Sequence, residues 1–207
     1  YHVVLTTTSA ITTSNPFYFG KQSTNYFSGC IDDFRLYKKV LTPDEVKHLY
    51  NRQLSGNSLA LHLPLSEPNN TSLDDKSIYK HVTTNHGVES GDIGPVGGSV
   101  KFKPFGVMDF DGTDDFVTNG SIVNSSMSSF FGRDAFTISL WINPGSVVGG
   151  SITIPINLGG MILFNYGHST YGYRQTWDIN DGSSNPATYT STFVINTWYH
   201  LVAVFKK

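Results

Sequence analysis

The residues best suited to binding chemistry lie in the stretch 164–180, where aromatic and amide side chains alternate. Tyr171, Tyr173, Gln175 and Trp177 fall on one face of a strand, because successive side chains of a strand point to opposite sides. A sugar presents apolar ring faces and a rim of hydroxyl groups, so aromatic platforms beside amides suit it. We predict a carbohydrate-binding face at these four residues. The competing interpretation is that these aromatic side chains pack the core.

A second group that could do chemistry is the acidic cluster of residues 109–115. Asp109, Asp111, Asp114 and Asp115 supply the carboxylate oxygens that Ca²⁺ prefers. However, Asp111 precedes Gly112, and an Asp-Gly pair is a strong signal for a hairpin turn. A turn without a metal is therefore the favoured interpretation of this cluster.

Charge and composition exclude several other classes of function. The formal net charge of −2 gives no basic footprint for nucleic acid, and no apolar run is long enough to span a membrane. The sequence has no Ser-His-Asp order, phosphate-binding glycine loop or His-Glu-x-x-His motif. Low charge (14%) with 14% aromatic residues and 20 glycines is typical of a β-rich surface domain.

The single cysteine excludes an internal disulfide. Cys30 is separated from Phe34 and Leu36 by an even number of positions, so in a regular strand the three side chains share a face. We therefore predict that Cys30 lies on the buried face of a strand as an inert thiol.

One helix is predicted, at about 42–52. Thr42 is its predicted N-cap, Pro43 suits the first turn, and Glu45 stands three residues after Thr42, which completes a capping box. Leu41 and Val46 are spaced for a hydrophobic staple.

Strands separated by glycine, proline, asparagine and aspartate turns are predicted for the rest of the chain. Apolar residues alternate in 59–65 and 136–142, and 198–205 is apolar on both faces, which predicts a strand covered on both sides. Residues 66–98 are polar and glycine-rich, so we predict long loops there. Trp141 and Trp198 are predicted to be core residues.

Several motifs together resemble the laminin-G-like, or concanavalin A-like lectin/glucanase, jelly-roll family. The family's opening half is similar to the segments LALHLPLSE, VMDFDGTDDFV, FTISLWINP and TWYHLVAVF, and its closing half to FYFGK and GCIDDFRLYKKVLTPDEVKHLYN. The resemblance implies an all-β, two-sheet antiparallel jelly-roll sandwich with the one short helix.

The order of these pieces is reversed in this chain. The closing strands and helix occupy 1–53, a connector occupies 54–58, and the opening and central strands occupy 59–207. We predict one compact, circularly permuted domain, because the first and last strands of a jelly roll are neighbours. The alternative is that the chain holds parts of two tandem domains.

The resemblance also implies a structural Ca²⁺ near the Ile-Asp-Asp strand and the opening acidic loop. It nominates Asp32, Asp33, Asp74 and Asp75 as ligands. The competing interpretation is an ion pair between Asp33 and Arg35, which share a strand face.

The glucanases of the superfamily carry paired carboxylates in a Glu-x-Asp-x-x-Glu strand, and this chain has no such motif among its three glutamates. We therefore expect no enzyme. We expect an extracellular recognition or adhesion module at a cell or virion surface, with glycans or surface proteins as partners. The alternative is a structural building block of a surface fibre or virion assembly, with self-assembly or tandem copies.

Overall fold

The computed structural model describes ten parts of the chain, which carry sixteen strands and one helix. These parts are residues 2–6, 17–51, 58–65, 73–91, 106–118, 135–145, 152–158, 162–169, 172–179 and 187–206. Tyr171 lies outside them, as does the connector apart from Ser58.

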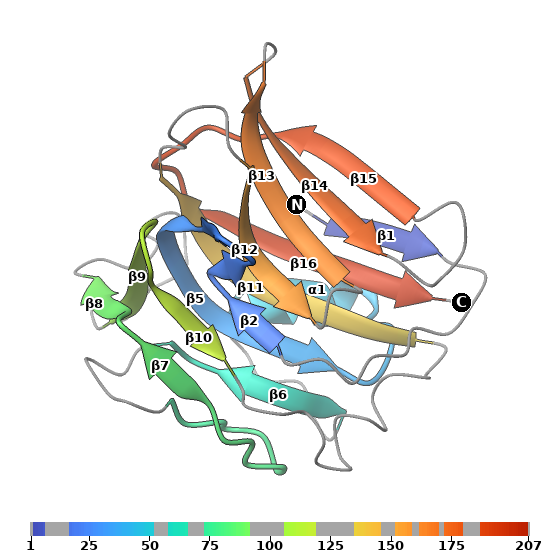
Figure 1. Cartoon of the computed structure of the whole chain (residues 1–207). Coiled ribbons are helices and arrows are strands. Elements are labelled where there is room, and N and C mark those ends of the chain that lie inside the picture. The colour runs from blue at the N-terminus through green and yellow to red at the C-terminus, as the bar shows by residue number, and fades with distance from the viewer. Residues whose placement is uncertain are drawn as a thin grey trace.

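Two seven-stranded sheets face each other across the core, as the predicted jelly-roll sandwich requires (Figure 1). The first sheet has the order β1-β16-β11-β5-β9-β8, with β6 also paired to β5. Its strands are β1 (His2–Thr6), β5 (Ser28–Tyr37), β6 (Leu59–Leu63), β8 (Glu89–Gly91), β9 (Val107–Asp111), β11 (Ala135–Pro144) and β16 (Tyr199–Lys206). Its pairs are antiparallel except that β1 runs parallel to β16.

The second sheet has the order β15-β14-β13-β12-β2-β10-β7, and every pair in it is antiparallel. Its strands are β2 (Phe17–Phe19), β7 (Thr84–His86), β10 (Phe116–Thr118), β12 (Ile152–Leu158), β13 (Ile162–Ser169), β14 (Gly172–Ile179) and β15 (Ala187–Thr192). A separate hairpin joins β3 (Lys21–Gln22) to β4 (Asn25–Tyr26).

Early and late segments of the chain are interleaved in both sheets. Strand β5 lies between β11 and β9, and β2 lies between β12 and β10. Strands β1, β2 and β5 of the first 51 residues are thus hydrogen-bonded to strands that lie far along the chain, although β5 also pairs with the nearby β6 and β3 pairs with β4. Whether this order reflects a circular permutation or two tandem domains in the parent protein stays a prediction.

The core between the sheets follows the alternation seen in the sequence. Phe136, Ile138, Leu140 and Ile142 of β11 all belong to the buried cluster, while Thr137, Ser139 and Trp141 point to the other side. On β16, Leu201, Ala203 and Phe205 enter the same cluster, and the intervening His200, Val202 and Val204 are also buried. The prediction of a strand covered on both faces is therefore confirmed by burial.

The predicted loop region 66–98 contains more regular structure than expected. Strands β7 and β8 form there, and Asp74 and Val82 make an isolated bridge. Backbone pairing with β10 and β9 gives these polar residues partners that a local sequence pattern does not show.

A bulge in β5 corrects the prediction for Cys30. The pairing shifts so that Ser139 faces Arg35 and Trp141 faces Asp32, which leaves two residues of β5 opposite Leu140. An extra residue reverses the alternation of faces, so Ile31 enters the core with Phe34 while Cys30 does not. Cys30 is half-buried, and burial followed by the charge of Asp109 raises the pKa of its thiol to about 12.

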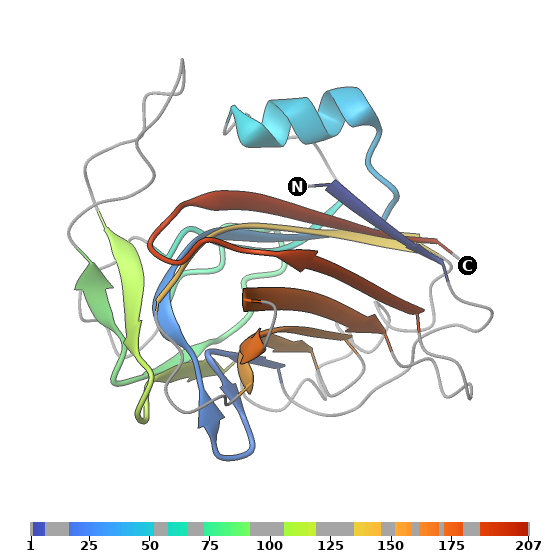
Figure 2. The same cartoon turned by 90° about the horizontal axis from the view of Figure 1, so that it is seen from above.

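Helix α1 (Pro43–Tyr50) lies on the outer face of the first sheet, away from the second sheet (Figure 2). The predicted capping box is present: the Glu45 amide donates to the Thr42 hydroxyl, and the Thr42 amide donates to the Glu45 carboxylate. Leu41 and Leu49 are buried against Tyr37, with Val46 packed beside them. Among the described residues, no helix has the length and apolar character needed to cross a membrane.

We expect Thr42→Ala to loosen α1 without disturbing the sandwich. Loss of an N-cap costs about 1 kcal/mol, so the hydrogen-exchange protection of the α1 amides should fall by about fivefold. Thr24→Ala, at an exposed threonine in the β3–β4 turn, is the control and should change nothing in α1. Equal exchange rates in both variants would show that the cap does not stabilise the helix.

Candidate functional site

Asp33, one of the four predicted calcium ligands, belongs to a buried hydrogen-bonded network on β5 and β6. Arg35 donates from Nε and Nη2 to the two carboxylate oxygens of Asp33, both at 2.9 Å, and the His62 ring lies 2.9 Å from the first of them. Asp33 sits in the left-handed region (φ 51°) at the β5 bulge, which turns its side chain toward these partners. The ion pair between Asp33 and Arg35, the interpretation that competed with calcium, is therefore present.

The Asp33 carboxylate is held in its charged form. Burial alone would raise its pKa, but the hydrogen bond from His62 and the charge of Arg35 outweigh burial and lower the pKa. The Arg35 pKa is raised despite burial, first by the charge of Asp33. The two groups thus stabilise each other's charged state.

Asp75 organises the loop that covers the edge of β6. One carboxylate oxygen accepts from the amides of His62 and Ser77, and the other accepts from the Ser77 hydroxyl and the His81 amide. The Lys76 amide donates to the His62 carbonyl, so the loop continues the pairing beyond β6. Asp75 therefore closes a strand edge that would otherwise expose unpaired backbone groups.

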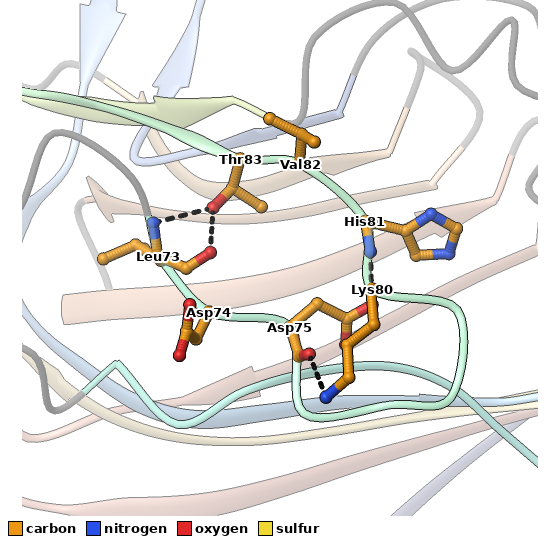
Figure 3. Close-up of a pocket in the computed structure, with 7 residues that line it drawn as sticks. All are labelled: Leu73, Asp74, Asp75, Lys80, His81, Val82 and Thr83. Carbon is orange, nitrogen blue, oxygen red and sulfur yellow. Dashed lines mark hydrogen bonds between the residues drawn. The ribbon is translucent and has the colours of Figure 1, made fainter.

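A pocket of about 390 Å³ opens beside this loop, lined by residues 73–75 and 80–83 (Figure 3). The Lys80 ammonium donates to the Asp75 carbonyl, and the Thr83 hydroxyl bridges the amide and carbonyl of Leu73. Burial lowers the pKa of His81. Asp74 is exposed and paired with Lys76 at 2.8 Å.

These contacts bear on the predicted calcium site. The oxygens of Asp33 and Asp75 are engaged by hydrogen-bond donors, whereas Ca²⁺ needs six to eight oxygens turned toward one point. Asp32 is buried and Asp74 is exposed, and no three of the four nominated carboxylates converge. The arrangement of the described residues fits an internal hydrogen-bonded network better than calcium ligation, and calcium at these four residues stays a prediction.

The acidic cluster of the β9–β10 turn does bring carboxylates together. One ligand oxygen from each of Asp111, Asp114 and Asp115 lies within 4.8 Å of the others. Asp115 accepts from the Asp111 amide, and Asp111 accepts from the Thr113 amide, which forms the predicted turn. Burial and then the neighbouring carboxylates raise the pKa of Asp115, so a bound cation would relieve repulsion there.

Strand β14 carries three of the four residues of the predicted sugar-binding face. In the backbone register Trp177 pairs with Phe164 of β13, Gln175 with Tyr166 and Tyr173 with His168. The binding site at these residues stays a prediction.

A pocket that the sequence did not predict lies between α1 and the outer face of the first sheet. Its volume is about 480 Å³, within the usual range for small-ligand sites. Helix α1 contributes Pro43, Val46, Lys47 and Tyr50. The sheet side contributes Trp141 of β11, Tyr199, His200 and Val202 of β16, and Trp198, which directly precedes β16. We call this the helix pocket.

Ring contacts build the floor of the helix pocket. The Trp141 ring lies 4.9 Å from the His200 ring and 5.3 Å from the Tyr50 ring, measured between centroids. The Ser139 hydroxyl and His200 Nε2 lie 2.9 Å apart and fix the imidazole. Trp141 and His200 are buried, whereas Tyr50 is 43% exposed and Trp198 is half-buried. Trp141 is therefore buried as predicted, beneath α1, and the prediction of a core role needs correction only for Trp198, which is not fully buried.

Helix α1 is held over this floor by the segment before it. The Thr137 hydroxyl of β11 accepts from the Leu41 amide at 3.1 Å and donates to the Lys39 carbonyl at 2.8 Å. Lys39 is also paired with Glu45. Because one end of α1 is fixed to β11 and its Leu49 is buried, Tyr50 is positioned above Trp141.

The comparisons with known proteins agree with this fold. The family model described as the concanavalin A-like lectin/glucanases superfamily matches residues 2–47 and 111–207, which is more than half of the chain. No curated protein and no solved structure gives a significant match. The chain belongs to the concanavalin A-like lectin/glucanase superfamily.

Replacing Asp33 tests the buried network. Asparagine keeps the left-handed backbone conformation but removes the charge, which leaves Arg35 buried without its anion. We expect Asp33→Asn to lower the free energy of unfolding by about 3–5 kcal/mol in urea denaturation at neutral pH.

The same variant should change the dependence of stability on pH. The Asp33 pKa is lower in the folded state than in the unfolded chain (about 3.9), so its stabilisation is complete above about pH 5 and is lost as the pH falls through the folded-state pKa. Asp33→Asn should therefore flatten the loss of stability in acid. Asp74→Asn, at an exposed pair, is the control, and an equal effect of both substitutions would contradict the assignment.

Proposed function

We propose that the chain is a non-catalytic recognition module that acts outside the cell and binds carbohydrate through the helix pocket. The single observation that carries the proposal is the clustering of Tyr50, Trp141, Trp198 and His200 around an open pocket of about 480 Å³. Tyr50 is exposed and Trp198 is half-buried at this pocket, and the apolar face of a sugar ring stacks on accessible aromatic rings. Membership of a superfamily that includes lectins supports the same function.

The helix pocket is an alternative to the predicted binding face on β14. Trp198 directly precedes β16 of the first sheet, whereas Trp177 belongs to β14 of the second sheet. Variants at these two positions can therefore separate the two sites.

We expect Trp198→Ala to weaken saccharide binding on a glycan array and in calorimetry by at least tenfold. Loss of one stacked ring removes about 1–3 kcal/mol, by analogy with stacking of other planar or ring-shaped ligands on aromatic side chains. Trp177→Ala is the matched variant, and after its fold is verified by circular dichroism it should leave affinity unchanged. Binding lost in Trp177→Ala but kept in Trp198→Ala would move the site to β14.

Calcium is the cofactor we propose, and the Asp111, Asp114 and Asp115 cluster is where the described carboxylates fit it. Extracellular calcium sites commonly have dissociation constants of about 0.1–1 mM, so 10 mM Ca²⁺ should raise the melting temperature by roughly 3–10 °C. Asp114→Asn should abolish the rise and Asp74→Asn should preserve it. The reverse pattern would favour the site implied by the family resemblance, and no rise in the unmodified chain would contradict calcium binding.

A structural role in a fibre or virion assembly is the second candidate. The loop of 73–83 exposes Ile78 and Val82, each 78% accessible, beside Tyr79 at 37%. Neighbouring apolar side chains of this kind are typical of contacts between proteins. Molecular mass in solution separates the candidates, because assembly predicts concentration-dependent oligomers without any saccharide.

A further inference from the structure

The described side chains that line the helix pocket carry positive but no negative charge, and they can donate more hydrogen bonds than they can accept. Among the described residues that line it, none is acidic, and Lys47 is the one with a permanent charge. A lysine ammonium and an indole N–H can only donate hydrogen bonds, and the tyrosine hydroxyls can donate as well as accept. The lining therefore offers mainly donors.

No acidic side chain among the described residues forms an ion pair with Lys47. Glu45, on the same helix, is engaged by Lys39 and by the Thr42 amide, which lower its pKa and hold it as a paired carboxylate. Asp44 belongs to the first turn of α1 but does not line the pocket. Lys47 is exposed, so its ammonium can reach a ligand without a large desolvation cost.

A cation would be disfavoured in this aromatic setting. Aromatic cages attract quaternary ammonium groups through the negative faces of their rings. Here the ammonium of Lys47 repels such a ligand. The same charge attracts a carboxylate or sulfate, which accepts hydrogen bonds and cannot donate them when ionised.

We propose that the helix pocket selects an anionic saccharide, with the sugar ring on Trp198 and Tyr50 and the carboxylate or sulfate beside Lys47. This inference rests on the proposed function, because it specifies the ligand of the same pocket. Aromatic stacking supplies affinity common to many sugars, and Lys47 supplies the preference for charge. The preference should weaken as ionic strength rises, since Lys47 is exposed to solvent.

The test compares matched saccharides on the full chain. Lactose, sulfated lactose and sialyllactose share one sugar backbone, and desulfated heparin is paired with heparin. Binding of each is measured by calorimetry at low and high salt. We expect the anionic partner of each pair to bind about fivefold more tightly at low salt, the upper range for one exposed ion pair. Comparison of the sulfated and sialylated forms decides between sulfate and carboxylate.

Two lysine variants separate a local contact from overall charge. Lys47→Gln should reduce the anionic ligand to the affinity of its neutral partner. Lys206→Gln removes the same charge from an exposed site on β16, four residues and about 13 Å beyond Val202, and should preserve the preference. Circular dichroism confirms that both variants are folded.

Three outcomes would overturn the inference. Equal binding of neutral and anionic partners would remove the preference, equal losses in the two lysine variants would assign it to overall charge, and unchanged selectivity in Lys47→Gln would place it elsewhere. In each of these cases saccharide binding itself can survive, and it then still depends on Trp198. No binding of any saccharide, or binding insensitive to Trp198→Ala, would instead contradict the proposed function.

Discussion

The pairing of β5 with β11 is the constraint on which the rest of the structure depends. It joins an early strand to a late one in the middle of the first sheet, with both faces of β5 covered. Helix α1 follows β5 closely, so this pairing also decides which part of the sheet the helix can cover. The Thr137 hydroxyl of β11 then fixes the segment before the helix. The β5–β11 pairing and the hydrogen bonds of Thr137 together position α1 over the sheet, and the helix pocket lies between them.

The bulge in β5 determines which side chains point to each of the two faces of the first sheet. Its extra residue lets Ile31 and Phe34 enter the core while Asp33 turns toward Arg35 and His62. A buried ion pair contributes little net stability, but removal of one partner leaves a costly unpaired charge. The network therefore acts mainly to specify one arrangement of β5, β6 and the loop held by Asp75.

Local sequence patterns predicted the elements well and their spatial neighbours poorly. The capping box of α1 and the alternation in β11 depend on residues a few positions apart, so they could be predicted from the spacing alone. The inert, half-buried Cys30 and the short strands β7 and β8 depend on a bulge and on distant partners. For the same reason the polar stretch 66–98 looked like loops, although β9 and β10 supply its pairing.

The sequence predicts the type of candidate site, a carbohydrate site built from aromatic side chains, but not the position that we propose for it. Aromatic and amide residues pointed to carbohydrate, but the alternation in 164–180 could not tell a core-facing row from an exposed one. Trp141 and Trp198 were both predicted to be core residues, and Trp141 is indeed buried, but it lies with Thr137 and Ser139 on the outward face of β11, where every second residue points. That alternation was a usable signal. What it could not show is that α1 packs over these rings and leaves a pocket.

A structure of the chain bound to a saccharide would be the most decisive measurement. We expect the sugar ring between α1 and the start of β16, stacked on Trp198 and in contact with Tyr50. A saccharide bound instead to the sheet that contains β14, with the helix pocket empty, would contradict carbohydrate binding through the helix pocket.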